Sequence, residues 1–333
     1  MSAPKAANRP KKARLVIGIV PHLARMEARR AARSTAASLE ASGVEVRVPA
    51  SDAVRVGLDE WAVPDDEFAK GLSYAFSLGG DGTMLRTVDL VCADGVPVVG
   101  VNVGHLGYLA SEHLSDIDGV VERVLRGDHG IEERMMLDIV VSAPRHRVRR
   151  FAALNDAVLE KSNAGNTVRL SVSFNDVPFA DYSADGVIVA TPTGSTAYAF
   201  SVRGPIVSPL MRALVVVPIS PHMLFDRSLV LSADETVRLE VLDGRTATLF
   251  VDGRDEGAVP GGAVVTCAAH QQPARLVTFG PRDFHGILKT KFELPGPGTR
   301  ARERFEAEGD TAEGDTAEGA APGPRVARGR RAR

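Results

Sequence analysis

The chain has 333 residues, 44% of them hydrophobic, and carries a formal net charge of −2 at pH 7. A chain of this length and apolar content can bury a large core and is expected to hold two domains. The nearly balanced charge argues against a nucleic-acid-binding protein, and no apolar run in the sequence is long enough to cross a membrane. We therefore expect a soluble, cytoplasmic protein without a nucleic-acid or membrane partner.

Strands and helices are predicted to alternate in the first part of the chain. Apolar runs at 15–20, 44–48, 74–78 and 96–101 indicate strands, and apolar residues recur at helical spacing at 23–41, 84–91 and 115–126. Residues 50–70 are polar and show no clear pattern. Alternation of this kind is typical of a parallel sheet with helical crossovers.

The pattern changes at about residue 132. Short β-type runs follow at 137–141, 148–154, 168–174, 187–190, 237–241, 248–251 and 263–268. We thus predict an α/β fold with an N-terminal parallel α/β domain plus a C-terminal β-rich domain. The predicted segments are a disordered lead-in (1–13), the α/β domain (14–130), the β-rich domain (131–280), a return segment to the first domain (281–294) and a disordered tail (295–333).

A glycine-rich turn joins the third predicted strand to the helix after it, where residues 78–83 read Leu-Gly-Gly-Asp-Gly-Thr. The glycines permit a close approach of a ligand that a Cβ would prevent, and the N–H groups that start the next helix favour phosphate. A carboxylate here, Asp81, makes chemical sense if it holds a metal ion or takes a proton from an attacking hydroxyl. A tight Gly-Asp-Gly turn without a ligand is the alternative.

Two further groups of residues have side chains suited to a nucleotide. Asn155 and Asp156 stand between two β-type runs, where a turn is the simplest interpretation, but an amide and a carboxylate together can hold a ribose. Residues 191–198 read Thr-Pro-Thr-Gly-Ser-Thr-Ala-Tyr, whose hydroxyls and backbone amides suit phosphate and ribose oxygens and whose Tyr198 could pack on a base. The sequence contains neither a dinucleotide Gly-x-Gly-x-x-Gly fingerprint after the first strand nor a P-loop.

In this order, Gly-Gly-Asp-Gly-Thr, the Asn-acid pair and the 185–198 segment closely resemble the NAD kinase family, and the resemblance runs from about residue 15 to 292. It implies a site between the two domains and a kinase that phosphorylates the adenosine ribose 2′-hydroxyl of NAD to give NADP, with ATP or polyphosphate as donor. It also implies Mg²⁺ or another divalent cation and a homodimer or homotetramer. The sequence itself assigns no metal ligands, because its two cysteines and eight histidines lack metal-site spacing.

The resemblance also implies roles for particular positions. Asp81 matches the aspartate proposed to activate the 2′-hydroxyl, so it is the predicted catalytic residue. The loop associated with the donor's phosphates corresponds to Gly79, Gly80, Gly82 and Thr83. The positions implied in NAD binding, some of them across a subunit boundary, are Asp81, Gly82, Asn155, Asp156, Asp185, Thr196, Ala197, Tyr198 and Ser201.

The sequence departs from the family's usual pattern in three places. Asp156 stands where Glu is usual, Arg203 replaces the first glycine of a Gly-Gly pair, and His105 and Tyr108 replace a basic residue and Phe. The first two could weaken or re-aim NAD binding.

Two other functions remain open from the sequence. A related lipid or sugar-phosphate kinase with the same Gly-Gly-Asp-Gly loop would leave the Asn155-Asp156 pair and residues 193–198 unexplained. A non-enzymatic NAD sensor would keep the pocket for binding alone, and the retained Asp81 argues against it.

Overall fold

The computed structural model describes residues 15–104, 107–110, 112–163, 166–242 and 244–294. The described residues up to Arg282 belong to one compact unit, and those from Asp283 onward belong to a second. The second unit contains one helix among its described residues, α6 (Phe284–Lys291), whose first turn is capped by the Asp283 carboxylate accepting from the Gly286 N–H.

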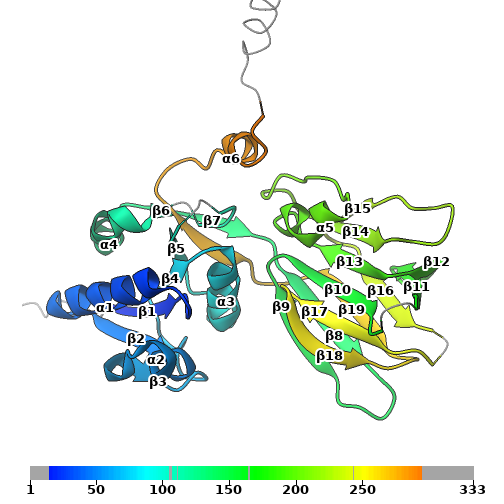
Figure 1. Cartoon of the computed structure of the whole chain (residues 1–333), viewed down its shortest axis with the longest axis horizontal. Helices are drawn as coiled ribbons and strands as arrows, with labels where there is room; N and C mark the ends of the chain where they lie inside the picture. Colours follow the sequence, from blue (N-terminus) through cyan, green and yellow to red (C-terminus); the bar gives the residue numbers. More distant parts are fainter. Residues whose placement is uncertain (1–14, 105–106, 111, 164–165, 243, 295–333) are drawn as a thin grey trace, which may run out of the picture. The chain divides into compact units, whose positions relative to one another are not determined.

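The first sheet has eight strands in the order β3-β2-β1-β4-β5-β20-β7, with β6 also paired to β5 (Figure 1). Its strands are β1 (Val16–Pro21), β2 (Glu45–Pro49), β3 (Ala62–Val63), β4 (Tyr74–Gly79), β5 (Val98–Asn102), β6 (Glu112–His113), β7 (Gly130–Arg134) and β20 (Ala274–Thr278). Every pairing is parallel except that of β7 with β20. The predicted parallel α/β domain is confirmed.

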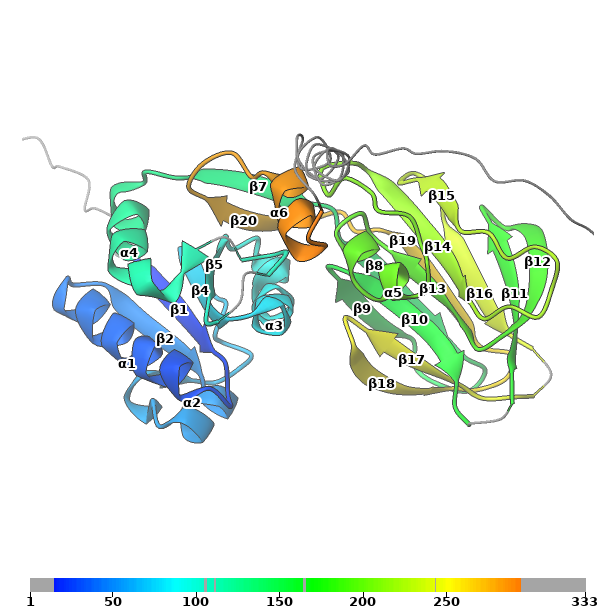
Figure 2. The same ribbon diagram turned by 45° about the horizontal axis from the view of Figure 1, so that its top comes forward.

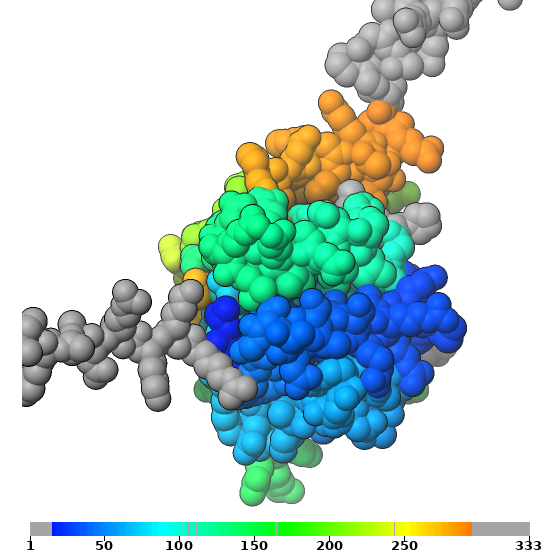
Figure 3. Space-filling view, turned by 90° about the vertical axis from the view of Figure 1, so that its left-hand side faces the viewer, coloured from blue at the N-terminus to red at the C-terminus, as the bar shows by residue number. Residues whose placement is uncertain are grey.

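Helices cover both faces of this sheet (Figure 1). They are α1 (Met26–Ala41), α2 (Ala50–Val56), α3 (Asp81–Val91) and α4 (Ile117–Arg126). On one face α1 and α4 pack in a common apolar cluster with β1, β4 and β5, and Figure 3 shows these two helices side by side. On the other face α3 packs through Met84, Val88 and Val91, which recur at helical spacing.

The sequence predicted three of these four helices. Helix α1 begins three residues later than predicted and ends before Gly43, whose φ of 78° is the left-handed conformation that closes many helices. Helix α2 was missed within residues 50–70, because it is short and buries a carboxylate, Asp52, beside Ala53 and Val56. Periodicity cannot reveal a seven-residue helix with a polar residue on its buried face.

The C-terminal domain consists of two antiparallel six-stranded sheets (Figure 2). One has the order β15-β14-β13-β10-β17-β18, and its strands are β10 (Asp156–Lys161), β13 (Gly186–Ala190), β14 (Ala213–Ile219), β15 (Leu229–Ser232), β17 (Ala247–Val251) and β18 (Arg254–Val259). The other has the order β12-β11-β16-β19-β8-β9, and its strands are β8 (Leu137–Ser142), β9 (Arg149–Ala153), β11 (Val168–Phe174), β12 (Val177–Ala184), β16 (Val237–Val241) and β19 (Val264–Ala269). The predicted C-terminal β-rich domain is confirmed.

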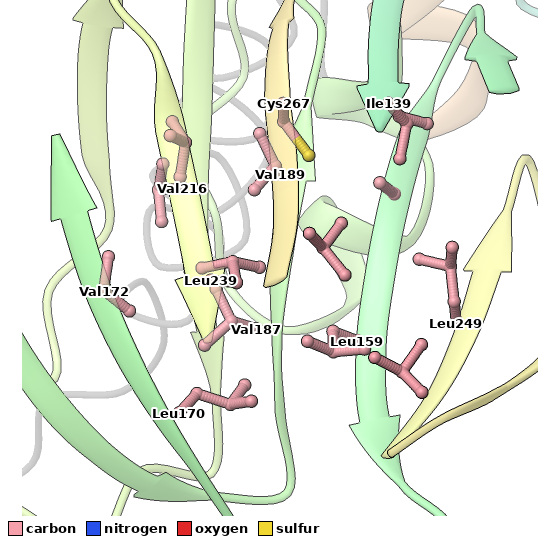
Figure 4. Packing of buried hydrophobic residues seen from close by; sticks show 14 of the residues in the cluster. Ile139, Leu159, Leu170, Val172, Val187, Val189, Val216, Leu239, Leu249 and Cys267 are labelled. Atoms are coloured by element: carbon pink, nitrogen blue, oxygen red, sulfur yellow. The ribbon is translucent and has the colours of Figure 1, made fainter. Parts of the chain in front are cut away.

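Alternating side chains from both sheets form one apolar core. Leu170 and Leu239 from one sheet and Leu159, Val187 and Leu249 from the other are all nearly or fully buried and belong to a single cluster (Figure 4). Burial alternates along β8, β16 and β17, as expected for strands with one face in a core, whereas β13 and β14 are buried at every residue because a second apolar cluster covers their other face.

Two of the strands that the sequence missed have a clear explanation. Strand β18 is polar and β12 is exposed over most of its first half, so neither shows the apolar alternation of a buried strand. Strand β14 was missed although all seven of its residues are buried and its sequence is almost entirely apolar. The predicted domain boundaries stay predictions. Within the range assigned to the β-rich domain, β20 hydrogen-bonds into the first sheet.

Candidate active site

The Gly-Gly-Asp-Gly turn connects β4 to α3. Gly80 caps the helix, its carbonyl accepts from the Thr83 and Met84 N–H groups at 3.0 Å each, and Asp81 is the first helical residue. The first N–H groups of a helix lack intrahelical acceptors, so those of Asp81 and Gly82 are donors for an anion. A Cβ on Gly80 or Gly82 would meet no atom within 4 Å, so both glycines border open space.

That space is a pocket of about 490 Å³ in front of the turn. It is lined by Gly80, Asp81, Gly82 and Thr83 and, from other segments, by Pro21, His22, Leu23, Ala24, Arg25 and Arg86. The predicted donor loop, apart from Gly79 in β4, therefore lines one pocket together with two guanidinium groups. Gly79 contributes by its size instead, because a Cβ there would overlap the Thr83 hydroxyl.

Sequence reasoning missed His22, Arg25 and Arg86 in this pocket. The signal for the first two was available, because β1 and β4 are parallel neighbours with Pro21 paired to Leu78, so the residues after each strand emerge at one sheet edge. Each guanidinium group is also held by a contact within the protein. Arg25 donates to the Val103 carbonyl, and Arg86 pairs with the buried Asp52 carboxylate.

The Asp81 carboxylate is held by the loop that follows β5. One oxygen accepts from the Tyr108 N–H at 2.9 Å and the other from the Leu109 N–H at 3.0 Å. The approach is so close that a Cβ on Gly107 would overlap the carboxylate. Glycine at 107 is therefore required by this contact, and the carboxylate has a defined orientation. His105, one of the predicted departures, lies outside the described residues.

A second pocket, of about 360 Å³, collects four of the predicted NAD-binding residues. Asn155, Asp156, Ala197 and Tyr198 line it, together with Leu85, Val158, Glu160, Phe250, Asp252 and Gly253. The Tyr198 hydroxyl donates to the Glu160 carboxylate at 2.7 Å, while the residue as a whole is 40% exposed. An amide, carboxylates and an exposed aromatic ring are thus brought together from β10, the 191–198 loop and the β17–β18 hairpin.

Asp156 is the most unusual carboxylate of this pocket. The residue is only 3% exposed, and within the described part of the chain its backbone N–H is hydrogen-bonded to Asp252 but its carboxylate has no hydrogen-bond partner. Burial, and to a lesser degree the nearby Asp252 carboxylate, raises the pKa of Asp156 to about 7. This carboxylate is therefore poised to change its charge near neutral pH.

Asp252 shapes the segment that carries the Asn-acid pair. Its carboxylate accepts from the backbone N–H groups of Leu154, Asn155 and Asp156 at 2.9, 2.7 and 3.2 Å. Its own pKa is raised by burial, against the lowering effect of these three donors. Sequence reasoning missed this residue, since Asp252-Gly253 reads only as the turn between β17 and β18.

The loop after β13 folds on its own hydroxyls. The Thr191 side chain donates to the Leu154 carbonyl at 2.5 Å, and that of Ser195 donates to the Pro192 carbonyl at 2.7 Å. The sequence suggested that the whole set of hydroxyls serves a ligand, whereas the structure gives these two buried groups internal partners. Gly194 packs so closely on the Asn155 carbonyl that a Cβ would overlap it, which brings this loop against the Asn-acid pair.

Three other predicted residues do not line these two pockets. Asp185 forms an ion pair with Lys161 at 2.5 Å, and the Thr196 hydroxyl donates to the Thr193 carbonyl at 3.2 Å. Ser201 lines a separate polar pocket of about 500 Å³ with Arg203, whose φ of 68° is a conformation that favours glycine.

Helix α3 borders both pockets, because Asp81 to Thr83 and Arg86 line the first and Leu85 lines the second. A helix N-terminus with a carboxylate and two arginines, next to a pocket with ribose-binding groups, defines a phosphotransferase that acts on a nucleotide.

Comparison with known proteins agrees with this class. Residues 17–129 match the ATP-NAD kinase N-terminal domain, and residues 154–279 match the ATP-NAD kinase C-terminal domain. The NAD kinase of Thermobifida fusca is 39% identical over 85% of this chain and 91% of its own, and that of Symbiobacterium thermophilum is 40% identical over 76% and 90%. The chain belongs to the NAD kinase family.

Solved structures share the fold. Yeast NADH kinase complexed with NADH has a TM-score of 0.79 at 24% identity, covering 87% of this chain and 91% of that one. An NAD kinase from Archaeoglobus fulgidus in complex with ATP has a TM-score of 0.64 at 22% identity, covering 85% and 100%. No helix in the described part of this chain is long and apolar enough to cross a membrane.

Proposed function

We propose that this protein is an NAD kinase, which transfers the terminal phosphoryl group of ATP to the 2′-hydroxyl of the adenosine ribose of NAD and releases NADP. The curated relatives at 35–40% identity are named NAD kinase, and the two structural relatives were solved with NADH and with ATP. The observation that carries the proposal is the position of α3, whose first turn borders the pocket with the arginines and whose Leu85 borders the pocket with Asn155 and Asp156.

The donor's phosphates would occupy the pocket in front of the Gly-Gly-Asp-Gly turn. Backbone N–H groups at the start of α3 and the Arg25 and Arg86 guanidinium groups are the donors available there. The same groups suit a chain of phosphates without a base, so polyphosphate is the second donor that we consider.

The acceptor's ribose would lie against Asn155 and Asp156, with the Tyr198 ring available to pack on adenine. Asp81 is proposed to take the proton of the attacking 2′-hydroxyl, as a base that two backbone N–H groups hold in one orientation. General-base catalysis of this kind contributes roughly 10²- to 10⁴-fold to the rate.

Magnesium is the cofactor that we infer. The described residues contain no group of three or more His, Cys, Asp and Glu side chains that could hold a metal ion. Mg²⁺ commonly enters kinase sites on nucleotide phosphates with only one or two carboxylates from the protein. Asp81 is the carboxylate of this pocket that could contribute, as the alternative to its role as the base, and the ion would neutralise charge on the transferred phosphoryl group.

We also infer a cytoplasmic homodimer or homotetramer. Ser201 lines a pocket other than that of Asn155 and Asp156, and Asp185 is paired with Lys161 away from both. The family resemblance implies that some NAD-binding positions act across a subunit boundary, which would account for their separation within one chain.

The test is formation of the product. The purified protein is incubated with NAD, ATP and Mg²⁺, and NADP is measured with an NADP-specific dehydrogenase. Parallel reactions replace ATP by polyphosphate or NAD by NADH, and Asp81→Asn serves as the inactive control. Tight binding of NAD without NADP formation under all these conditions would favour the sensor instead.

A further inference from the structure

Three charged side chains, Glu132, Arg134 and Arg282, form a buried network near the two pockets. Glu132 in β7 pairs with Arg134 at 2.5 Å and with Arg282 at 3.6 Å. The three side chains are only 16%, 5% and 10% exposed, respectively. Strands β7 and β20 are neighbours in the first sheet, so Glu132 and the segment that leads from β20 to Arg282 are held together by the sheet itself.

One end of this network reaches the carboxylate proposed as the base. Arg282 donates to the carbonyls of Tyr108, at 3.3 Å, and Leu109. These are the two residues whose N–H groups bind the Asp81 carboxylate. The carbonyls of residues 108 and 109 therefore bind Arg282, and the N–H groups of the same two residues bind Asp81. A shift of Arg282 is expected to move the N–H groups that orient the Asp81 carboxylate.

The other end reaches the loop of the dinucleotide pocket. Arg134 donates to the Thr193 hydroxyl at 3.3 Å, and the Thr193 carbonyl accepts from the Thr196 hydroxyl at 3.2 Å. Ala197 and Tyr198, which follow directly, line the pocket that holds Asn155 and Asp156. Every step from Asp81 to this loop is a hydrogen bond or an ion pair between partly or fully buried groups.

Stabilisation of the fold is a weak explanation for the buried network of Glu132, Arg134 and Arg282. Arg134 and Arg282 both pair with Glu132, and desolvation by burial, together with repulsion from Arg134, lowers the pKa of Arg282. Buried ion pairs are commonly no more stabilising than well-packed apolar residues, and their best-attested use is to specify one arrangement.

We propose that Glu132, Arg134 and Arg282 are positioning residues that couple the Thr193–Tyr198 loop to Asp81, so that a bound dinucleotide sets the orientation of the carboxylate that serves it. The inference rests on the function proposed above. When a dinucleotide contacts Ala197 and Tyr198, any displacement of the loop is passed from Thr193 to Arg134, through Glu132 to Arg282, and from there to the 108–109 backbone around Asp81. The network touches neither reacting group.

Two variants test the coupling at different links. Glu132→Gln removes the central charge at nearly constant shape, and Thr193→Val removes one acceptor while all charges remain. Each should lower kcat by roughly 10- to 100-fold, the scale of a misplaced catalytic group, with KM for ATP within about twofold of wild type. Glu122→Gln, the same change in an exposed pair with Arg126 on α4, should leave kcat unchanged.

The double variant Glu132→Gln/Thr193→Val should be no slower than Glu132→Gln alone, because the Glu132 substitution has already interrupted the network between Thr193 and Asp81. Amide hydrogen exchange gives a readout without catalysis: NAD should slow exchange at Tyr108 and Leu109 in wild type and in Glu122→Gln, but not in Thr193→Val. Multiplied losses in the double variant, or a stability change with unaltered kcat and unaltered protection, would overturn the proposal. If wild type makes no NADP, the proposed function fails, and the exchange experiment still decides whether the two loops are coupled.

Discussion

The pKa of Asp156 predicts a pH dependence that can be measured in both stability and activity. The residue is 3% exposed, and the pKa of its carboxyl is raised to about 7 by burial, with a smaller contribution from Asp252. Replacing it with asparagine keeps the shape of the side chain and removes the ionisation. Asp156→Asn is therefore the perturbation that isolates the charge.

The size of the effect on the free energy of unfolding follows from the difference between the pKa values of Asp156 in the folded and the unfolded protein. A pKa of about 7 in place of the ordinary 3.8 corresponds to a cost of roughly 4 kcal/mol for ionising Asp156 in the folded protein. Below about pH 4 the carboxyl is protonated in both states and this cost is absent. Between pH 4 and 7 the folded state binds the proton and the unfolded chain does not, so the folded state loses stability as the pH rises, and above pH 7 the full cost remains.

Urea unfolding of wild type and Asp156→Asn at pH 5 and pH 8 measures this difference. The free energy of unfolding of the variant should rise relative to wild type by up to about 3 kcal/mol between these two values. Asp181→Asn, a half-exposed carboxylate on β12 that faces Arg169, is the matched control and should show no such trend.

The same ionisation should appear in the kinetics. An ionised acceptor binds ribose hydroxyls more strongly than a protonated one, so kcat/KM for NAD should rise through about pH 7 in wild type. That rise should be absent in Asp156→Asn, since kcat/KM reports the ionisations of the free enzyme. An unchanged pH profile in the variant, or an equal stability difference at pH 5 and pH 8, would refute the reasoning.

The remaining predictions concern the donor pocket and the departures from the family pattern. Asp81→Asn should lower kcat for NADP formation by roughly 10²- to 10⁴-fold without lowering the Tm, because a loop carboxylate contributes little to the core; near wild-type turnover would exclude a catalytic role. Arg25→Gln should raise KM for ATP by roughly tenfold or more and leave KM for NAD unchanged, since it removes a charged donor from one pocket only; equal changes in both constants would contradict the assignment of the pockets. Arg203→Gly should raise KM for NAD or the donor without loss of stability, because the φ of 68° suits glycine; unchanged kinetics would mean that Arg203 only contacts solvent.

The glycine-rich turn of the proposed donor side was predictable, because it depends on local pattern and on one general rule. A strand, a Gly-Gly-Asp-Gly turn and a helix are contiguous, and parallel strands deliver their carboxyl ends to one edge of the sheet. The position of the 107–109 loop next to Asp81 follows from the same rule, since β4 and β5 are parallel neighbours. Sequence reasoning missed His22, Arg25 and Arg86 of the donor pocket, and also the backbone contact that requires glycine at 107.

The acceptor side was predictable only in part. Asn155, Asp156, Ala197 and Tyr198 were found through their resemblance to a family pattern, and they do line one pocket. Asp252 was not found, because it acts on backbone groups 96 to 98 residues away and its own neighbours indicate only a turn. Contacts between segments so distant in sequence cannot be predicted from the spacing of neighbouring residues.

Hydroxyl groups show the limit of reading chemistry from residue type. A loop with four Ser and Thr residues predicts many ligand contacts, yet the Thr191 and Ser195 hydroxyls bond to carbonyls of the Leu154 and Pro192 residues instead. A short loop with few apolar residues must satisfy its own buried backbone groups, and Ser and Thr side chains serve that need as well as they serve a ligand.

Helix α3 explains how one chain can hold both substrates in register. Its first turn carries Asp81, Arg86 in its second turn pairs with buried Asp52 of α2, and Asp89 near its end pairs with Arg254 of the β17–β18 hairpin. The hairpin turn carries Asp252, which holds the Asn-acid segment of the acceptor pocket. Because the helix is rigid and tied at each of these points, a movement of the donor loop relative to the acceptor pocket must strain at least one of them. Phosphoryl transfer depends mainly on holding donor and acceptor oxygens in line, and a helix that borders both pockets supplies that constraint directly.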